Sequence, residues 1–277
     1  MNRPPRHWAP VKRPLVMGIV NVTPDSFSDG GRHAGPDAGL AHGLALLSDG
    51  ADILDIGGES TRPGAAPVSE DEELARVIPV ITALRARADA PLSIDTMKPG
   101  VARAAVLAGA TIWNDVNALR SPGAAQTAAD LGCEVVLMHM LGEPMTMQQA
   151  PRYDDVVAQV ETFLLDRARA ALDAGVDRDR IWLDPGIGFG KTPHHNLALL
   201  AALPRFVSLG FRVLLGASRK RFIAALDPLG AEPDARLGGS LAAALAGAAA
   251  GVAAARVHDV RQTVQALTID AAIRDAG

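Results

Sequence analysis

The feature that most constrains the fold is a unit that recurs along the chain. Each copy has a helix-forming segment, a glycine, a few further residues, a short apolar run and then a polar residue. Six copies place their glycines at positions 50, 109, 132, 175, 210 and 251. A glycine suits the C-terminus of a helix because it adopts the left-handed conformation without a Cβ penalty. The apolar run that follows is typical of a strand buried on both faces of a parallel sheet.

Two further apolar runs, at 15–20 and 92–94, bring the number of expected strands to eight. Eight alternating strands and helices in about 250 residues are typical of a TIM (β/α)8 barrel. A doubly wound open sheet is the alternative, but it would more often show a dinucleotide fingerprint after its first strand, and none is present. No linker-like composition divides the chain. We therefore expect one α/β barrel domain over residues 15–277, preceded by a flexible lead-in at 1–14.

Composition narrows the classes of function. The 277 residues include 27 Lys and Arg against 31 Asp and Glu, a net charge of −4, which argues against a protein that mainly binds nucleic acid. The single cysteine, Cys133, excludes a disulfide framework, fits a reducing cytoplasm and is expected in the core. Residues 237–255 carry no charge, but they are mostly Ala and Gly and their second half is better interpreted as a strand than as part of a membrane span.

Polar side chains follow nearly every expected strand. In a barrel, the carboxyl ends of the strands meet at one mouth, where catalytic groups lie. These ends carry Asn21, Asp55, Asp95, Asn114 with Asp115, His139, Asp184, Ser218 with Arg219 and Lys220, and Arg256 with His258. A single strand-terminal Asp more often caps the next helix than takes part in chemistry. Because all of these side chains converge, however, we expect a binding site.

Two features indicate the class of ligand. Cations gather after the seventh and eighth strands, at the usual phosphate corner of this fold, and comprise Arg219, Lys220, Arg221, Arg256 and His258. In an acidic chain, a local basic corner favours a small phosphorylated substrate. Asp95, Asn114 and Asp184 offer acceptors for the N–H groups of a planar heterocycle, since a carboxylate matches such an edge at two points.

Two segments look like known motifs, a P-loop and a metal-binding pair of histidines, but neither is interpreted as such a site. Residues 190–192 (GKT) resemble the end of a P-loop, but Pro185 stands where its first glycine belongs. Residues 184–191 are interpreted as a tight loop that lets backbone approach a ligand. His194 and His195 are expected as an exposed pair at a helix start, without a metal partner at ligand spacing.

Together, these segments resemble the signatures of the dihydropteroate synthase family, the pterin-binding enzymes of the folate pathway. The matching segments are 21–31 (NVTPDSFSDGG), 55–64 (DIGGESTRPG), 93–96 (SIDT), 114–115 (ND), 138–140 (MHM), 146–148 (TMQ), 184–191 (DPGIGFGK), 218–220 (SRK) and 256–260 (RVHDV). They fall on every barrel unit in order, so the resemblance covers about residues 15 to 275.

The resemblance implies a Mg²⁺-dependent transferase that joins 6-hydroxymethyl-7,8-dihydropterin diphosphate to 4-aminobenzoate. Diphosphate would leave first, and the arylamine would then capture the pterin cation to give 7,8-dihydropteroate. The resemblance also implies a sulfonamide target and a cytoplasmic homodimer. Its partners would be these small-molecule substrates, with neither nucleic acid nor a membrane among them.

The resemblance also assigns roles to individual residues. The catalytic residues would be Asp95, Asn21, Arg62 and Lys220. The pterin would be held by Asp95, Asn114, Met138, Asp184 and Lys220, and 4-aminobenzoate by Thr61, Arg62, Pro63, Phe189 and Lys220. The diphosphate would contact Asn21, Arg62, Arg256 and His258, with Asn21 also at the Mg²⁺ ion.

One departure and two alternatives stay open. Some family members have Ser after the equivalent of Lys220, whereas this chain has Arg221, which leaves details of the aminobenzoate pocket undetermined. A methyltetrahydrofolate-dependent methyltransferase domain would share the pterin-binding Asp and Asn residues but would not need the basic corner or residues 61–63. A pterin-binding paralogue without activity should lack charged motif residues, and none is missing here.

Overall fold

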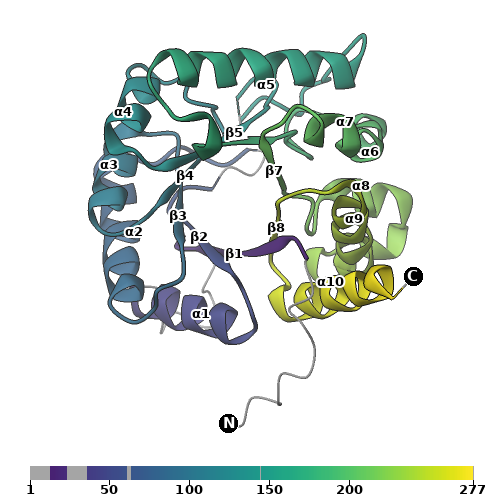
Figure 1. Ribbon diagram of the computed structural model, residues 1–277, viewed down its shortest axis with the longest axis horizontal. Helices are drawn as coiled ribbons and strands as arrows, with labels where there is room; N and C mark the ends of the chain where they lie inside the picture. Colours follow the sequence, from purple (N-terminus) through teal and green to yellow (C-terminus); the bar gives the residue numbers. More distant parts are fainter. Residues whose placement is uncertain (1–12, 24–35, 61–63, 144, 277) are drawn as a thin grey trace.

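Eight parallel strands form a closed barrel in the computed structural model, which describes residues 13–23, 36–60, 64–143 and 145–276. Each strand pairs with the next, and β8 pairs with β1 to close the ring (Figure 1). The strands are β1 (Leu15–Asn21), β2 (Ile53–Gly57), β3 (Leu92–Asp95), β4 (Ile112–Asp115), β5 (Glu134–Met138), β6 (Ile181–Asp184), β7 (Arg212–Leu215) and β8 (Ala254–Val257). The predicted (β/α)8 barrel is confirmed.

Helices surround the strands, as Figure 1 shows. They are α1 (Pro36–Ser48), α2 (Glu70–Arg85), α3 (Pro99–Leu107), α4 (Ala124–Leu131), α5 (Val156–Asp173), α6 (Pro193–Ala201), α7 (Leu203–Val207), α8 (Arg221–Leu226), α9 (Leu237–Ala250) and α10 (Val260–Asp275), with short 3-10 turns at η2 (Arg178–Arg180), η3 (Pro228–Gly230) and η4 (Pro233–Arg236). The last helix, α10, lies beside α9 and against β1, so the end of the chain packs on its first strand.

The glycines of the recurring unit have the conformation that their positions require. All six have positive φ angles, between 61° and 115°, and Gly132 and Gly251 are themselves the left-handed caps of α4 and α9. An L-residue with a Cβ atom adopts this conformation only with strain. The glycines therefore end the helices and direct the chain back toward the barrel.

Alternation along the strands sets the interior of the barrel. A separate apolar cluster is formed by Met17, Ile53, Ile112, Val136, Trp182, Leu214 and Ala254, one residue from each of seven strands. Since successive side chains point to opposite faces, the residue two positions later points to the same side. Those next positions include Asp55, Asn114, Met138, Asp184 and Arg256. A polar layer therefore lies directly beyond the apolar one, toward the carboxyl ends of the strands.

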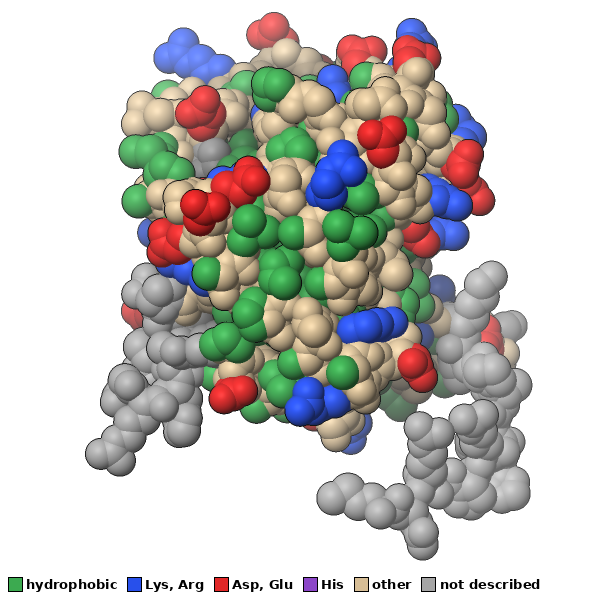
Figure 2. All heavy atoms as spheres, turned by 90° about the vertical axis from the view of Figure 1, so that its left-hand side faces the viewer, with side chains coloured by type: hydrophobic (Ala, Val, Ile, Leu, Met, Phe, Trp, Pro, Cys, Tyr) green, Lys and Arg blue, Asp and Glu red, His purple; other side chains and the backbone are tan. Residues whose placement is uncertain are grey.

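One side of the outer surface is mixed in charge. Figure 2 shows the side of the barrel that lies on the left of Figure 1, where Lys and Arg side chains are interspersed with Asp, Glu and apolar side chains. The uncharged stretch 237–255 forms α9 and the first part of β8. Among the helices that the structure describes, none is both long and apolar enough to span a membrane.

Candidate active site

At the mouth of the barrel, one guanidinium group joins two strand-end carboxylates. Arg256 Nε lies 2.5 Å from Asp55 Oδ2, and Arg256 Nη2 lies 2.7 Å from Asp95 Oδ2. Asn114 Nδ2 donates to the same Asp55 oxygen at 3.1 Å. The other oxygens, Asp55 Oδ1 and Asp95 Oδ1, are buried without a hydrogen-bond partner among the described residues. One positive charge therefore serves two buried carboxylates, and two acceptor atoms stay unsatisfied.

The pKa of Asp95 is raised in this environment. Burial is the largest cause; Arg256 opposes it, whereas the neighbouring acids Asp55, Glu73 and Asp115 add to it, so that the pKa of Asp95 reaches about 7. The carboxylate form of Asp95 is therefore finely balanced against the protonated form at neutral pH. A ligand that brings N–H donors or positive charge would favour the carboxylate.

Asp115, next to Asn114, has a structural role. Its Oδ1 accepts the N–H of Asn117 and its Oδ2 accepts the N–H of Leu119, both at 2.7 Å. These bonds stabilise a turn in which Ala118 and Leu119 have positive φ angles. Burial raises the pKa of Asp115 to about 6, while the two N–H donors lower it. Of this pair, Asn114 belongs to the site.

Asp184 ends β6 and is buried. Its Oδ1 accepts the N–H of Gly186 at 2.7 Å. Gly216 occupies the next inward position after Leu214 and leaves space beside Asp184, since a Cβ atom there would lie 3.6 Å from Asp184 Oδ2. Burial raises the pKa of Asp184, and the Gly186 N–H together with nearby cations opposes this rise.

Lys220 and Phe189 form one wall of the site. Lys220 Nζ lies 4.1 Å from the centroid of the Phe189 ring, a cation–π contact. The lysine stem crosses Gly188, where an added Cβ atom would lie 3.0 Å from Lys220 Cδ. Phe189 packs against the apolar cluster of Met138, Val116, Met140 and Met147. The structure thus brings Met138, Phe189 and Lys220 together, as their assignment to neighbouring parts of one site requires.

Arg219 does not contribute its charge to the basic corner as expected. Its Nε and Nη2 contact the two oxygens of Asp259 at 3.0 and 2.6 Å, and its Nη1 contacts Asp234. Arg219 has a φ angle of 58°, which is unusual for a residue with a side chain, and its N–H donates to Ser240 Oγ at 2.9 Å. These contacts make Arg219 an anchor for the loop that presents Ser218 and Lys220.

His258 lies against Ser218 at the same corner. The distance from His258 Nδ1 to Ser218 Oγ is 3.1 Å, and the His258 N–H donates to the same oxygen at 3.2 Å. Burial and the cations Arg256, Arg219 and Lys220 lower the pKa of His258 to about 3. The imidazole is therefore neutral at pH 7 and can offer a phosphate a hydrogen bond but no charge. Its assignment to the diphosphate stays a prediction.

Asn21 offers an amide oxygen at the mouth of the barrel, and its assignment to Mg²⁺ and the diphosphate stays a prediction. It ends β1, is half-buried, and its side chain has no hydrogen-bond partner within the described part of the chain. Mg²⁺ commonly takes one or two protein oxygens and completes its shell with substrate phosphates and water. Across the described ranges, no group of three His, Cys, Asp or Glu residues could hold a metal. A single amide oxygen beside a diphosphate fits this donor set.

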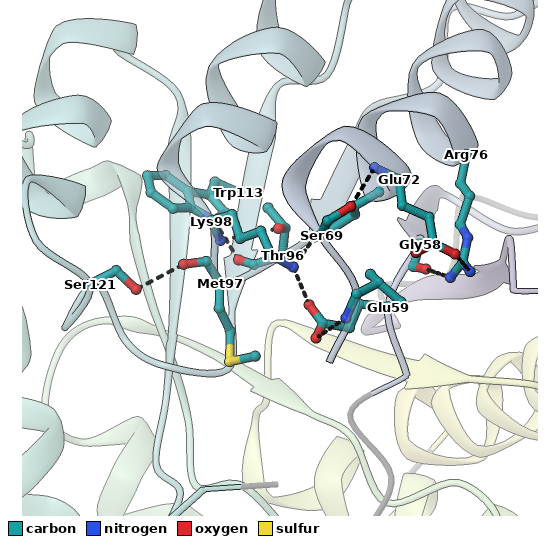
Figure 3. A network of polar contacts seen from close by, with 12 residues as sticks. Gly58, Glu59, Ser69, Glu72, Arg76, Thr96, Met97, Lys98, Trp113 and Ser121 are labelled. Carbon is teal, nitrogen blue, oxygen red and sulfur yellow. Dashed lines mark hydrogen bonds and ion pairs between the residues drawn. The ribbon is translucent and has the colours of Figure 1, made fainter. Parts of the chain in front are cut away.

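The expected aminobenzoate residues Thr61, Arg62 and Pro63 lie outside the described residues, so their roles stay predictions. The segment that leads to them is anchored by a half-buried charge cluster around Lys98, seen in part in Figure 3. Lys98 Nζ lies 2.5 Å from Glu59 Oε2, a contact drawn in Figure 3, and it lies 2.6 Å from Glu73 Oε2. Because Lys98 follows Asp95 by three residues, this cluster ties the segment after β2 to the strand that carries Asp95.

Backbone contacts fix the same region. Trp113 Nε1 donates to the carbonyl of Thr96, and Ser121 Oγ donates to the carbonyl of Met97, both at 2.8 Å (Figure 3). Arg76 Nη1 donates to the Gly58 carbonyl at 2.7 Å. The loops after β2 and β3 are thus held to α2 and to β4.

Some outcomes concern residues outside the predicted site. Cys133 is buried, as expected, and burial raises its pKa to about 11. His194 is exposed, but the expectation of an exposed pair is wrong for His195, which is half-buried and forms a capping box with Thr192 at the start of α6. His195 is turned toward the protein because its neutral imidazole accepts a hydrogen bond from the backbone N–H of Thr192, at 3.3 Å from Nδ1.

Sequence reasoning assigned no role to three residues that contribute to the site: Asp55, Lys98 and Lys191. Asp55 has a usable signal, because it stands two positions after the inward-facing Ile53. Lys98 has none, since its carboxylate partners are 39 and 25 residues away. Lys191 is buried behind the loop after β6, where its incomplete P-loop sequence gives no indication of its surroundings.

Comparison with known proteins agrees with this geometry. The family described as pterin binding enzyme matches residues 17–258. The dihydropteroate synthase of Escherichia coli strain K12 is 47% identical over 259 residues, which cover 94% of this chain and 91% of that protein.

Solved structures extend the likeness to the fold. Xanthomonas albilineans dihydropteroate synthase with 4-aminobenzoic acid has a TM-score of 0.91 and 55% identity, over 96% of each chain. The enzyme from the same organism in complex with 7,8-dihydropteroate has a TM-score of 0.87 and 54% identity, over 95% of each chain. The chain therefore belongs to the pterin-binding enzyme family, among its dihydropteroate synthases.

Proposed function

We propose that this chain condenses 6-hydroxymethyl-7,8-dihydropterin diphosphate with 4-aminobenzoate by a Mg²⁺-dependent, dissociative substitution. The observation that carries the proposal is the set of buried acceptors at the strand ends. Asp95 and Asp184 present carboxylates to one mouth, and Asp95 Oδ1 has no partner among the described residues. Relatives with this activity share about half of the sequence.

Recognition of the pterin follows from these acceptors. The pyrimidine edge of a pterin carries ring N–H and amino donors, which bind carboxylates through charge-assisted hydrogen bonds. Asp184 and Asp95 would accept these donors, and Asn114 would supply an amide that can both donate and accept. Met138 and Phe189 would cover the apolar faces of the ring, and Lys220 would donate to its carbonyl oxygen.

The reaction needs stabilisation of charge more than a strong nucleophile. When the diphosphate leaves, positive charge develops on the pterin methylene group and spreads into the dihydropterin ring. A buried carboxylate such as that of Asp95 stabilises this charge strongly because little water screens it. The amine of 4-aminobenzoate is itself the nucleophile, so the protein contributes mainly position and electrostatics.

The diphosphate would be met from β1 and β8. Arg256 uses Nε and Nη2 for Asp55 and Asp95, which leaves Nη1 outside these two contacts. Nη1 would donate to a phosphate oxygen, with His258 as a neutral donor. Mg²⁺, held by Asn21 and the diphosphate oxygens, would make the diphosphate a better leaving group.

The proposal is tested by incubating the protein with both substrates, with and without Mg²⁺, and detecting 7,8-dihydropteroate by mass spectrometry. We expect product only with Mg²⁺ and loss of product in Asp184→Ala. Slow release of 6-hydroxymethyl-7,8-dihydropterin when aminobenzoate is omitted would support departure of diphosphate first. Pterin binding without any product would instead favour a non-catalytic paralogue, and methyl transfer from methyltetrahydrofolate would favour the methyltransferase alternative.

Assembly and location also stay predictions. We expect a homodimer, seen by light scattering as twice the 28.8 kDa mass of one chain. A mass of one chain at micromolar concentration would contradict this. A cytoplasmic location is expected from the single unpaired cysteine.

A further inference from the structure

Lys191 places a buried ammonium group behind the predicted pterin pocket. The residue is 3% exposed, and three acceptors surround its Nζ: His139 Nδ1 at 2.9 Å, the His139 carbonyl at 3.2 Å and the Phe189 carbonyl at 3.0 Å. An ammonium group has three N–H donors, so these acceptors satisfy it completely. The arrangement fits a charged lysine beside a neutral imidazole that keeps its proton on Nε2.

His139 does not compete with Lys191 for the charge. Burial and the nearby Lys191 lower the pKa of His139 to about 3. The edge of its ring packs against Phe163, with 4.9 Å between the ring centroids. A neutral imidazole of this kind is an acceptor for the lysine.

The contacts of Lys191 join the end of β5 to the loop after β6. A Cβ atom at Gly186 would lie 1.9 Å from the His139 carbonyl oxygen and 3.3 Å from Lys191 Nζ, so the two segments touch at this glycine. The carbonyls of Gly188 and Gly190 are also bound, by Gln148 and Tyr153 at 2.7 and 2.8 Å. Among these donors to the loop, Lys191 alone is charged.

Gly186 also connects Lys191 to Asp184, because its N–H donates to Asp184 Oδ1 at 2.7 Å. Burial raises the pKa of Asp184, whereas Lys220, Lys191 and Arg256 each lower it. In return, burial lowers the pKa of Lys191 to about 7, and Asp184 raises it. Below pH 7, Lys191 is therefore mostly charged.

We propose that Lys191 is a positioning residue of the pterin pocket, whose ammonium group keeps Asp184 in its carboxylate form and holds the Phe189 backbone against the end of β5. The inference rests on the pterin role proposed above for Asp184. A carboxylate can accept a hydrogen bond at either oxygen, whereas a protonated Asp184 would present an O–H toward an N–H donor. Removing the Lys191 charge should therefore weaken pterin binding most at acid pH.

Other titratable or charged groups face Lys191 and Asp184, and their effects on the pH dependence have to be distinguished from that of Lys191. They are His139 after β5, Tyr153 before α5, His195 on α6, Lys220 before α8 and Arg256 on β8. Lys220 and Arg256 are unchanged in every variant below. Burial lowers the pKa of His195 from its usual value, so a His195→Gln variant is included as a control.

The experiment measures the affinity for 6-hydroxymethylpterin by calorimetry at pH 5.5 and 7.5. Relative to the unmodified protein, Lys191→Met should lose more affinity at pH 5.5 than at pH 7.5, by up to about tenfold for each unit by which the pKa of Asp184 rises. Lys191→Arg keeps the charge and should show a similar loss at both pH values. His195→Gln should follow the unmodified protein. Equal losses in Lys191→Met at both pH values would overturn the inference.

A second readout needs no ligand. In a protein with 13C-labelled aspartate, the carboxyl resonance of Asp184 is assigned by its absence in Asp184→Asn. Its titration midpoint should move to higher pH in Lys191→Met and stay in place in Lys191→Arg; an unmoved midpoint in both contradicts the inference. If Lys191→Met does not fold, Lys191→Gln removes the charge while keeping donors. If the unmodified protein binds no pterin, the proposed function fails, but the midpoint still tests Lys191.

Discussion

Arg256 and Asp95 form an ion pair, with 2.7 Å between Nη2 and Oδ2, although they are 161 residues apart in the sequence. The same guanidinium contacts Asp55, so the two carboxylates share one cation. Buried charge that is only half compensated is unfavourable for the folded protein. It is favourable for a reaction in which positive charge develops on the ligand, because the environment is already organised for it. Stability and activity are therefore opposed at Asp95.

The Asp95→Asn variant should be more stable than the unmodified protein at pH 8 and inactive. Because the folded-state pKa of Asp95 is raised to about 7, its ionisation removes stability as pH rises from about 4 through 7. Asparagine removes that penalty, and each pKa unit corresponds to about 1.4 kcal/mol. Because Arg256 loses one partner at the same time, we expect the free energy of unfolding to rise by only about 1–3 kcal/mol. Thermal unfolding at pH 8 and pH 5 measures it, and the gain should shrink at pH 5. A less stable variant at pH 8 would contradict the opposition described above.

The pH dependence of the reaction should have an acid limb near pH 7. The proposed role of Asp95 requires its carboxylate, which is lost as pH falls through a pKa of about 7. We expect kcat/KM to fall about tenfold per pH unit below that value. Initial rates from pH 5 to 9, with the free Mg²⁺ concentration held constant, provide the measurement. A limb at pH 4 to 5, the ordinary range for a carboxyl group, would mean that another acid controls the rate.

Removing Arg256 should destabilise the fold at neutral pH and less so in acid. Arg256→Met leaves Asp55 and Asp95 buried without their cation, a change that typically costs about 3–5 kcal/mol. At pH 5, below its pKa of about 7, Asp95 can take up a proton instead, so the loss should be smaller. Chemical denaturation at pH 5 and 8 tests this. In binding assays, the variant should lose more affinity for pterin diphosphate than for the pterin alcohol; equal losses would make Arg256 purely structural.

Lys98 should matter for stability in the same way, at the cluster that anchors the segment after β2. Lys98→Met leaves Glu73, which is fully buried, and Glu59 without their cation, and we expect a loss of about 2–4 kcal/mol. The matched control is Arg103→Met, because the Arg103–Asp130 pair is 4.0 Å apart and half-exposed; it should change stability by less than about 1 kcal/mol. Urea unfolding at pH 7.5 compares them. Similar losses of stability in the two variants would show that the cluster around Lys98 contributes no more than an exposed ion pair.

The strands and helices could be predicted because their signals are local. The glycine that ends a helix stands a few residues before the next strand, so both elements can be located. Parallel strands end at one edge of the sheet, and for this reason Asp95, Asn114 and Asp184 were expected in one site. Pairings between side chains could not be predicted in this way. Arg219 follows β7 and Arg256 lies near the end of β8, both in the basic corner, yet one binds Asp259 and the other binds Asp55 and Asp95. Which carboxylate each arginine binds depends on the direction in which its side chain points. For Arg219, that direction is set by a left-handed backbone conformation.

The close contact between Gly186 and His139 gives the sharpest test of how the pocket is built. Gly186 has a φ angle of 69°, and an added Cβ atom would lie 1.9 Å from the His139 carbonyl oxygen. Gly123 is a matched control, because its φ angle is 75° but no atom lies within 4 Å of the added Cβ position. Both substitutions by alanine impose the left-handed strain of about 1–2 kcal/mol. Only Gly186→Ala must also push the loop after β6 away from β5.

We therefore expect Gly123→Ala to lower the melting temperature by a few degrees and to leave pterin affinity unchanged. Gly186→Ala should lower it further and weaken pterin binding at least about tenfold, since a displacement of the loop moves the N–H that holds Asp184 and the carbonyl that holds Lys191. Calorimetry and thermal unfolding on the two variants give both values. If Gly186→Ala bound pterin as tightly as Gly123→Ala, the contact between the loop and His139 would not be needed to form the pocket, and the coupling of Lys191 to Asp184 would have to run through the side chains alone.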